Sequence, residues 1–559
     1  MKALMSALLF FFLLVQSSVE AAPAYAYRVT FKDKNGTLSF ADSLQFLSAK
    51  ALQRRAFQGI PLDSTDLPVV QAYIDTVVQT SNALRLHAVS KWFNQVVVIC
   101  SDSMKRVDLA ALPMVADVKL VARFNNGVFR PAPDTKKFPE VEPSMALNKT
   151  TGNSAYYGLS YQQVDLIEAD CLHDLGFRGD NMDIAVFDIN FRYTNTCIAF
   201  DSLRQAQRIK DTFNFARDTA WVFNGAIPSS HGMNVLGCMA ANWPGTYVGT
   251  APMANYYLYI TEDALVEQPI EEDNWLAAAE RADSAGVYLI NSSLGYNQFD
   301  NVLSSSNYTY ADMNGQTSLI ARAANKAVSK GIFVVNAQGN EGFSAWHYLL
   351  TPADGDSVYA VGMVDGSGMW GGSGYGPTVD GQIKPDGMAL GKGAGLIGDN
   401  CQVGFANGSS FASPIMCGAI ACLWQANPAL PVWKLRNIIR MSSDRYTNPN
   451  NTHGFGIPNF CTAYGIVTGT ADVQSIDHRY GLFPNPSWNG EFQIKAYEGA
   501  DPLYAIRIYD ATGRLVYSES AQQSRTRTIS ALSQMPAGNY VVLLSTPTRQ
   551  YSTLFAKAQ

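Results

Sequence analysis

The central part of the chain contains the segment G-S-S-F-A-S-P-I-M-C-G-A-I-A-C-L-W, residues 408–424. Residues 412–424 are apolar or small on nearly every side, so the segment predicts a buried helix. Gly408 permits a close backbone approach, and Pro414 falls early enough in the helix to be tolerated. A serine at the start of a buried helix suits anion chemistry, because the helix dipole and free N–H groups stabilise negative charge. Ser410 is therefore a candidate nucleophile.

The sequence around this helix alternates between strand-like and helix-like segments. Helical patterns at Trp275–Ser284 and Leu319–Ser329 are followed by Gly286 and Gly331, which can end a helix. Between the helices lie apolar runs without alternation, typical of strands buried on both faces of a parallel sheet: Ile184–Phe187, Tyr256–Ile260, Val287–Ile290, Ile332–Val335 and Val358–Val361. We expect a three-layer α/β domain over residues 156–468.

Polar side chains follow several of these predicted strands. Asp188, Ser293 and Asn340 each stand where a strand ends. Ligand sites in open α/β sheets form beyond the carboxyl ends of the strands. An activated serine needs a neighbouring base and a group that orients the base, and His231 and Asp188 are the candidates for these roles beside Ser410.

The context of His231 separates it from the other histidines, of which the chain has six in all. It opens a predicted helix in S-S-H-G-M-N-V-L-G, with Ser229 or Ser230 available as the N-cap. Taken singly, each candidate has an ordinary structural explanation, since an aspartate after a strand is usually a turn residue. The interpretation therefore depends on the combination.

In combination these segments resemble the subtilisin-like serine peptidases of the S8 family. G-S-S-F-A-S-P resembles the family's G-T-S-M-A-S-P, and the Asp, His, Ser order along the chain is the one known for subtilisin. Further blocks agree with the family: S-H-G-M-N-V-L-G (230–237), G-T-A-P (249–252), N-S-S-L-G (291–295), N-A-Q-G-N-E-G (336–342) and G-P-T-V-D-G-Q-I-K-P-D (376–386).

The resemblance implies a role for each site residue. Ser410 would be the nucleophile, His231 the general base and then acid, and Asp188 the orienting carboxylate. The side-chain amide of Asn340 and the backbone N–H of Ser410 would form the oxyanion hole. Ser293-Leu294-Gly295 would pair with the substrate backbone as an edge strand. The implied function is a secreted serine endopeptidase, made as a zymogen, that hydrolyses proteins or peptides through an acyl-enzyme intermediate.

Two positions depart from the family pattern. The family usually has aspartate, a small residue and glycine where this chain has Asp188-Ile189-Asn190. Asparagine tolerates the left-handed region, so we expect Asn190 to preserve the turn. Met233 stands where threonine usually follows His-Gly, and we expect altered packing near the base. Neither departure removes a chemical group.

Two other classes of function are alternatives. In an α/β-hydrolase esterase the serine would precede its acid and its histidine, and only His453 and His478 follow Ser410. The non-enzymatic alternative is a catalytically inactive subtilase-fold surface adhesin or binding protein.

The N-terminal region predicts a signal peptide and a propeptide. Residues 1–21 comprise Lys2, an apolar run and small residues near Ala21, which is typical of a signal peptide. No later apolar run reaches the ~18 residues of a membrane span. Over residues 22–124 the pattern predicts an α+β domain of the split-βαβ type. Its runs F-L-S-A-K-A-L-Q-R-R (46–55) and S-K-W-F-N-Q-V-V-V (90–98) resemble the propeptides of this peptidase group, which implies an inhibitor and folding aid.

Two further segments flank the α/β domain. Residues 125–155 are rich in Pro, Asn, Thr and Lys and predict an exposed linker that is cut during processing. Residues 480–559 predict an all-β sandwich. Its run L-F-P-N-P-S (482–487) resembles the sorting domain of type IX secretion, which implies export through the periplasm of a Gram-negative cell, then release or surface attachment. A carbohydrate- or protein-binding sandwich is the alternative.

Composition limits the partners and cofactors. The net charge of −6 argues against a nucleic-acid surface. The eight cysteines show no metal spacing, one or two bridges are compatible with export, and Cys417 and Cys422 are interpreted as buried apolar residues. We expect no required cofactor. Calcium is common in the resembled family, but no D-x-D-x-D-G loop supports it here.

Overall fold

The computed structural model describes residues 24–124, 142–143, 153–225, 227, 229–264, 267–300, 306–468, 480–485, 487–496, 502–510, 514–545 and 550–558. The chain divides into two compact units, Met1–Ala463 and Tyr464–Gln559. The predicted signal peptide and most of the predicted linker lie outside the described residues.

The N-terminal region is a four-stranded antiparallel sheet in the order β2-β3-β1-β4. Its elements are β1 (Ala24–Phe31), α1 (Ala49–Gln58), α2 (Gln71–Gln79), β2 (Arg85–Ser90), β3 (Gln95–Cys100), α3 (Lys105–Ala110) and β4 (Val115–Phe124). The split-βαβ prediction is confirmed for the strand order, but the first helix packed on the sheet is α2, which was not predicted, whereas no residue of α1 belongs to this core. Val29, Val96 and Val98 form the core with Ile74 and Val77 of α2.

The central sheet has seven parallel strands in the order β14-β13-β12-β11-β6-β10-β7. The five predicted apolar runs fall on the five inner strands. The two edge strands were missed, since β7 carries polar residues in I-K-D-T-F-N and β14 is only four residues long. The strands are β6 (Asp183–Asp188), β7 (Ile209–Asn214), β10 (Asn255–Ile260), β11 (Leu289–Ser292), β12 (Phe333–Ala337), β13 (Tyr359–Val364) and β14 (Gly387–Leu390).

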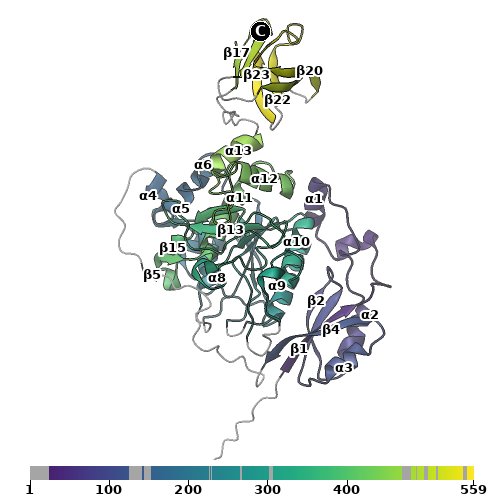
Figure 1. Cartoon of the computed structure of the whole chain (residues 1–559). Coiled ribbons are helices and arrows are strands. Elements are labelled where there is room, and N and C mark those ends of the chain that lie inside the picture. Colours follow the sequence, from purple (N-terminus) through teal and green to yellow (C-terminus); the bar gives the residue numbers. More distant parts are fainter. Residues whose placement is uncertain are drawn as a thin grey trace, which may run out of the picture. The chain divides into compact units, whose positions relative to one another are not determined.

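Helices cover both faces of this sheet, which confirms the three-layer prediction (Figure 1). α9 (Ile270–Ala285) and α10 (Leu319–Ser329) pack on one face through a core that includes Trp275, Ile290 and Val334. α8 (His231–Ala240) and α11 (Ser409–Ala426) lie on the other face. Gly286 and Gly331 follow α9 and α10 with φ of 89° and 87°, so the predicted helix ends are confirmed.

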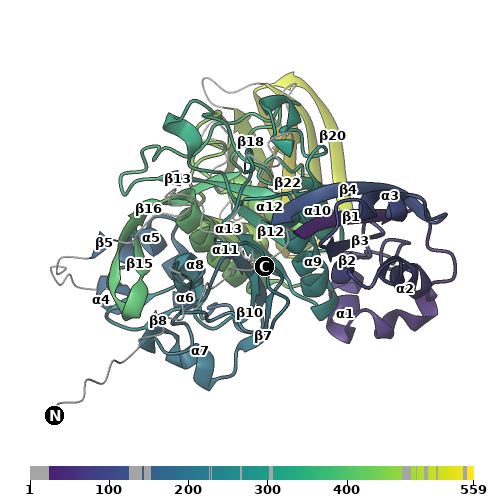
Figure 2. The same cartoon turned by 90° about the horizontal axis from the view of Figure 1, so that it is seen from below.

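Smaller elements surround these layers (Figure 2). A hairpin of β15 (Lys392–Ile397) and β16 (Val403–Asn407) carries β5 (Glu142–Pro143) along its edge. Within the predicted linker, Glu142 and Pro143 thus pair with Phe405 and Gly404 of the hairpin. The others are α4 (Asn153–Tyr157), α5 (Tyr161–Asp165), α6 (Ala169–Asp174), α7 (Asp201–Gln205), β8 (Asn242–Trp243), β9 (Tyr247–Val248), α12 (Val432–Met441) and α13 (Phe460–Thr468).

The C-terminal unit has two antiparallel sheets, as the all-β prediction requires. Phe492, Ile494, Ile506, Val542 and Phe555 meet in its core. One sheet contains β17 (Tyr480–Phe483), β18 (Phe492–Ala496) and β21 (Thr526–Ile529), and the other β19 (Leu503–Tyr509), β20 (Leu515–Ser524), β22 (Gly538–Ser545) and β23 (Gln550–Lys557).

The cysteines form two disulfides, Cys171–Cys461 and Cys197–Cys401. Such bonds persist in oxidising compartments, in agreement with export. Cys417 and Cys422 are fully buried thiols, as predicted. Among the described helices, none has the length and apolar character that a membrane crossing requires.

Candidate active site

Asp188 and His231 form a buried pair. Asp188 is the last residue of β6, and His231 is the first residue of α8. The His231 Nδ1 atom lies 2.7 Å from Asp188 Oδ1, which also accepts the N–H of Ile189 at 2.8 Å. Because Nδ1 faces the carboxylate, proton exchange with another group falls to Nε2. The pair therefore has the geometry of a base and its orienting group.

The turn after Asp188 is held by the side chain of Asn190. Asn190 preserves the turn as expected, but not through a left-handed backbone, since its φ is not positive. Its Nδ2 group donates to the carbonyl oxygens of Asn224 and Ser229 at 2.8 and 3.0 Å, and its Oδ1 atom accepts the Asn224 N–H at 3.2 Å. Amide hydrogen bonds thus take the place of a glycine turn and join it to the loop that leads to His231.

Gly232 packs directly against this turn. A Cβ at Gly232 would lie 2.5 Å from the Asn190 carbonyl oxygen and 3.0 Å from Asp188 Cβ. Any other residue would therefore push the start of α8 away from the carboxylate. The requirement for glycine after the histidine is steric.

Of the two candidate capping serines, Ser230 occupies the N-cap position of α8. The hydroxyl of Ser229 accepts the N–H of His231 at 3.3 Å, whereas Ser230 makes no side-chain cap bond. Met233 is fully buried in the same turn, so the residue that departs from the family pattern lies inside the protein.

Ser410 lies in the first turn of α11 and is 5% exposed. Pro414 lies inside α11, beyond its first turn. The prediction that proline is tolerated here because of an early position is therefore wrong. Proline lacks the N–H that would donate to the Ser410 carbonyl four residues earlier. The Ser293 hydroxyl donates to that carbonyl instead, at 2.8 Å. The Ser410 hydroxyl in turn lies 3.4 Å from the Ser293 carbonyl oxygen.

Asn340 follows β12 and is tied to the residue before Ser410. Its Oδ1 atom accepts the backbone N–H of Ser409 at 2.8 Å and lies 3.0 Å from the Ser409 hydroxyl. That hydroxyl is also 3.0 Å from the Gly339 carbonyl oxygen. Because α11 holds the Oδ1 atom, the NH2 group of Asn340 is the part of the side chain that can donate a hydrogen bond to a ligand. Sequence reasoning missed Ser409, whose signal was the doubled serine in G-S-S.

A cleft of about 210 Å³ is lined by Ser410 and Asn340 together. The segment Ser293-Leu294-Gly295, just beyond β11, lines it too. The Asn336 amide holds the Leu294 carbonyl at 3.0 Å, and a Cβ on Gly295 would lie 2.8 Å from Leu350 Cβ. The predicted site residues Ser410, Asn340 and Ser293 are thus brought to one cleft.

The described lining of this cleft is acidic. Glu262, Glu267 and Glu341 line it, and no lysine, arginine or histidine does. Burial raises the pKa of Glu341 to about 7. Glu262 and Glu267 were not predicted, because they lie in loops that carry no recognisable spacing, and Glu341 lies in the block N-A-Q-G-N-E-G, in which only Asn340 was given a role.

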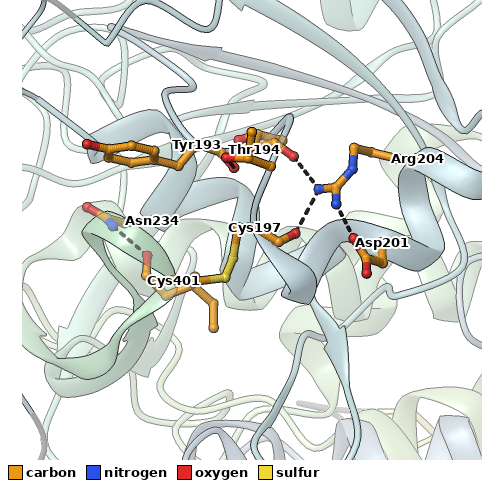
Figure 3. The surroundings of a disulfide bond; sticks show 9 residues. Tyr193, Thr194, Cys197, Asp201, Arg204, Asn234 and Cys401 are labelled. Carbon is orange, nitrogen blue, oxygen red and sulfur yellow. Dashed lines mark hydrogen bonds and ion pairs between the residues drawn. A yellow bond between two sulfur atoms is a disulfide. The ribbon is translucent and has the colours of Figure 1, made fainter.

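The Cys197–Cys401 disulfide joins the segments that carry the site (Figure 3). Cys197 lies after the Asp188 turn, and Cys401 precedes the strand that leads to Ser410. Arg204 donates to the Cys197 carbonyl at 2.7 Å, and Asn234 of α8 donates to the last carbonyl of β15 at 2.6 Å. The disulfide therefore cross-links the segments of Asp188 and Ser410, and a hydrogen bond joins the helix of His231 to the strand before Cys401.

Three carboxylates could in principle hold a cation. Glu262, Glu267 and Glu271 each place an oxygen within 4.8 Å of the others. The Glu271 oxygens accept the N–H groups of Asp263 and Gln268, at 2.7 and 3.3 Å, and so serve the fold. That no cofactor is required stays a prediction.

Comparison with known proteins agrees with this geometry. Residues 26–137 match the peptidase S8 propeptide domain of Bacteroidota, residues 182–457 match the subtilase family, and residues 481–556 match the secretion system C-terminal sorting domain. Subtilisin DY from Bacillus licheniformis is 27% identical over 297 residues, which cover 52% of this chain and 93% of that protein. Subtilisin E from Bacillus subtilis (strain 168) is 28% identical over 310 residues, 55% of this chain and 70% of that protein.

Proposed function

Since the chain belongs to the subtilase family of serine peptidases and is made as a secreted zymogen with its own propeptide, we propose that it is an endopeptidase that uses Ser410, His231 and Asp188 as its catalytic triad. The observation that carries the proposal is the buried 2.7 Å contact between His231 and Asp188, with the His231 ring 5.8 Å from the ring of Phe411, the residue after Ser410.

In the proposed reaction, His231 Nε2 takes the proton of the Ser410 hydroxyl while the oxygen attacks the substrate carbonyl. The negative charge that develops on the carbonyl oxygen is stabilised by the Asn340 NH2 group and the Ser410 backbone N–H. His231 then gives its proton to the leaving amine, and the acyl group stays on Ser410. Water, deprotonated by His231, hydrolyses that ester. Asp188 holds the imidazole in place throughout.

The substrate backbone would pair with Ser293-Leu294-Gly295. Two observations support this proposal: the segment lines the cleft, and it continues from β11 at the carboxyl end of the sheet. The fixed carbonyl of Leu294 and the close packing of Gly295 on Leu350 make the segment rigid. A rigid edge lowers the entropy lost when an extended peptide binds.

Digestion of a peptide library by the processed protein tests endopeptidase activity. We expect internal cleavage that is absent in Ser410→Ala. The same variant tests self-processing, because the isolated full chain should stay uncut between residues 125 and 155 when Ser410 is replaced. Trimming of Ser410→Ala at the wild-type rate would rule out self-processing. A fully folded wild-type protein that cuts no peptide would favour the inactive adhesin.

The sorting domain places the protein outside the cell or on its surface. For the route, we propose passage through the periplasm followed by export that depends on the C-terminal sandwich. Deletion of residues 480–559 should leave the enzyme in the periplasm, whereas normal release of the truncated chain would contradict the proposed route.

A further inference from the structure

A group of aromatic rings lies on the surface beside the cleft. The loop after β12 carries Phe343, His347 and Tyr348, and the loop after β13 carries Trp370 and Tyr375; these five residues are called the aromatic shelf below. Phe343 is 79% exposed in the chain that still carries its propeptide. A single exposed phenylalanine is ordinary, whereas a contiguous apolar surface marks a binding site.

The rings of the aromatic shelf follow one another without a break. The ring centres are 4.9 Å apart for Phe343 and Trp370, 5.0 Å for Trp370 and Tyr375, 6.1 Å for Tyr375 and His347, and 4.2 Å for His347 and Tyr348. All four separations lie in or near the range in which aromatic rings contact each other. The shelf is therefore one continuous surface built by two loops.

Two glycines hold the shelf in shape. A Cβ on Gly372, whose φ is 108°, would lie 2.5 Å from Phe343 Cε2, and a Cβ on Gly342 would lie 2.4 Å from Trp370 Cζ2. Each ring thus packs directly on the backbone of the other loop. The Trp370 indole N–H donates to the Ser373 carbonyl at 3.2 Å, so the apolar part of the ring is left for a partner. A rigid surface loses little side-chain entropy when it binds.

The shelf is joined to the cleft through the backbone. Gly339 lines the cleft, and its carbonyl accepts the Gly374 N–H at 3.2 Å. Phe343 follows Asn340 by three residues, which span about 10 Å at most when extended. An extended substrate advances about 3.3 Å per residue, so a side chain two to four residues from the bond that is cut can reach the shelf.

The order of the loops indicates which half of a substrate meets the shelf. Under the proposed function, the acyl half pairs with residues 293–295 after β11, and Asn340 after β12 marks the carbonyl of the bond that is cut. In the sheet, β13 lies on the side of β12 away from β11, and the loop after β13 carries Trp370 and Tyr375. The shelf therefore faces the half of the substrate that leaves first.

We propose that the aromatic shelf binds bulky apolar side chains, aromatic ones above all, in the substrate segment that follows the bond that is cut. The inference rests on the proposed peptidase function and adds a substrate class to it. Polypeptides with an aromatic residue two to four positions after a bond are cut there in preference to polypeptides with small polar residues.

The test compares two peptides that share one acyl half. Their leaving halves are five residues of glycine and serine, with tryptophan or serine at the third position. For the processed protein, kcat/KM should be about tenfold higher for the tryptophan peptide, since burial of an aromatic ring favours binding. Phe343→Ala should reduce this ratio to about threefold or less. Tryptophan placed three positions before the bond instead should give a ratio that does not depend on Phe343.

Trp433→Ala is the matched control. Trp433 is also an exposed aromatic residue, at 66%, but it lies on α12 and outside the shelf. The ratio of the two kcat/KM values should stay within about twofold of the wild type in this variant. Thermal unfolding establishes that both variants are folded, which we expect because both side chains are mainly exposed.

Binding of the two leaving halves alone separates this inference from the proposed catalysis. Fluorescence anisotropy of dye-labelled peptides on the processed protein requires no bond to be cut, and the tryptophan peptide should bind about tenfold more tightly, with most of the gain lost in Phe343→Ala. A protein that cuts neither peptide but keeps this difference would contradict the endopeptidase proposal and support the shelf. Ratios that are the same in the wild type and in folded Phe343→Ala, in kinetics and in binding, would overturn the shelf.

Discussion

The Oδ1 atom of Asn340 accepts the backbone N–H of Ser409, the residue before the proposed nucleophile, at 2.8 Å. The Ser409 hydroxyl lies 3.0 Å from the same oxygen. This contact orients the amide, because an oxygen turned toward α11 leaves the NH2 group for the cleft. The donor of the proposed oxyanion hole is thus positioned by the same helix turn that positions Ser410.

Asn340→Ala should lower kcat by about 10²–10³ and leave KM nearly unchanged, because the amide acts on charge that appears only in the transition state. Steady-state kinetics on a chromogenic peptide measures both constants. Gln298→Ala, which changes another amide in the same cleft, should stay within about threefold of the wild type. A rise in KM with kcat intact would assign Asn340 to substrate binding instead.

Ser409→Ala should lower kcat about tenfold, since the amide of Asn340 loses one of its two holding contacts. The loss should vanish when Asn340 is already alanine, because Ser409 then has no amide to orient. A double-mutant cycle on kcat measures this coupling. Fully additive losses would show that Ser409 acts through general stability rather than through Asn340.

Gly232→Ala should destabilise the protein by about 1–3 kcal/mol and lower kcat, because the new methyl group would overlap the Asn190 carbonyl. Gly225→Ala, in the loop before α8, is a matched control, since a Cβ there has nothing within 4 Å. Its stability should stay within about 0.5 kcal/mol of the wild type. Denaturant unfolding of both variants tests the difference, and equal stabilities would contradict the steric argument.

The charge of the cleft should depend on pH through Glu341. Burial raises the pKa of this carboxyl to about 7, so it is neutral at pH 6 and charged at pH 8. The preference for a lysine-containing peptide over its norleucine counterpart should therefore rise with pH, by about fivefold, or about 1 kcal/mol. The ratio of the two kcat/KM values removes the shared pH dependence of the catalytic groups. Glu341→Gln should make this ratio independent of pH. If the ratio still rises with pH in that variant, Glu341 is not the cause of the pH dependence.

The inner layers of the fold were predictable because burial on both faces leaves an uninterrupted apolar signal. The inner strands β6, β10, β11, β12 and β13 carry that signal, whereas the exposed edge of β7 mixes lysine and aspartate with apolar residues and hides it.

The site was predictable where chemistry requires a residue type at a fixed place, as for Asp188 and His231. The site was not predictable where a polar group finds its hydrogen-bond partner on a distant part of the chain. The bond from Ser293 to the carbonyl left open by Pro414, and the amide of Asn190 in place of a glycine turn, join residues that the sequence separates widely. The acidic lining from Glu262 and Glu267 depends on loop geometry in the same way.

The most direct test of the account is labelling of the processed protein with a fluorophosphonate probe, followed by mass spectrometry of the labelled peptide. The account predicts one modified residue, Ser410, with labelling abolished in Ser410→Ala and strongly slowed in His231→Ala. A folded, processed protein with an open cleft that leaves Ser410 unlabelled, or that is labelled elsewhere, would contradict the assignment of Ser410 as the nucleophile.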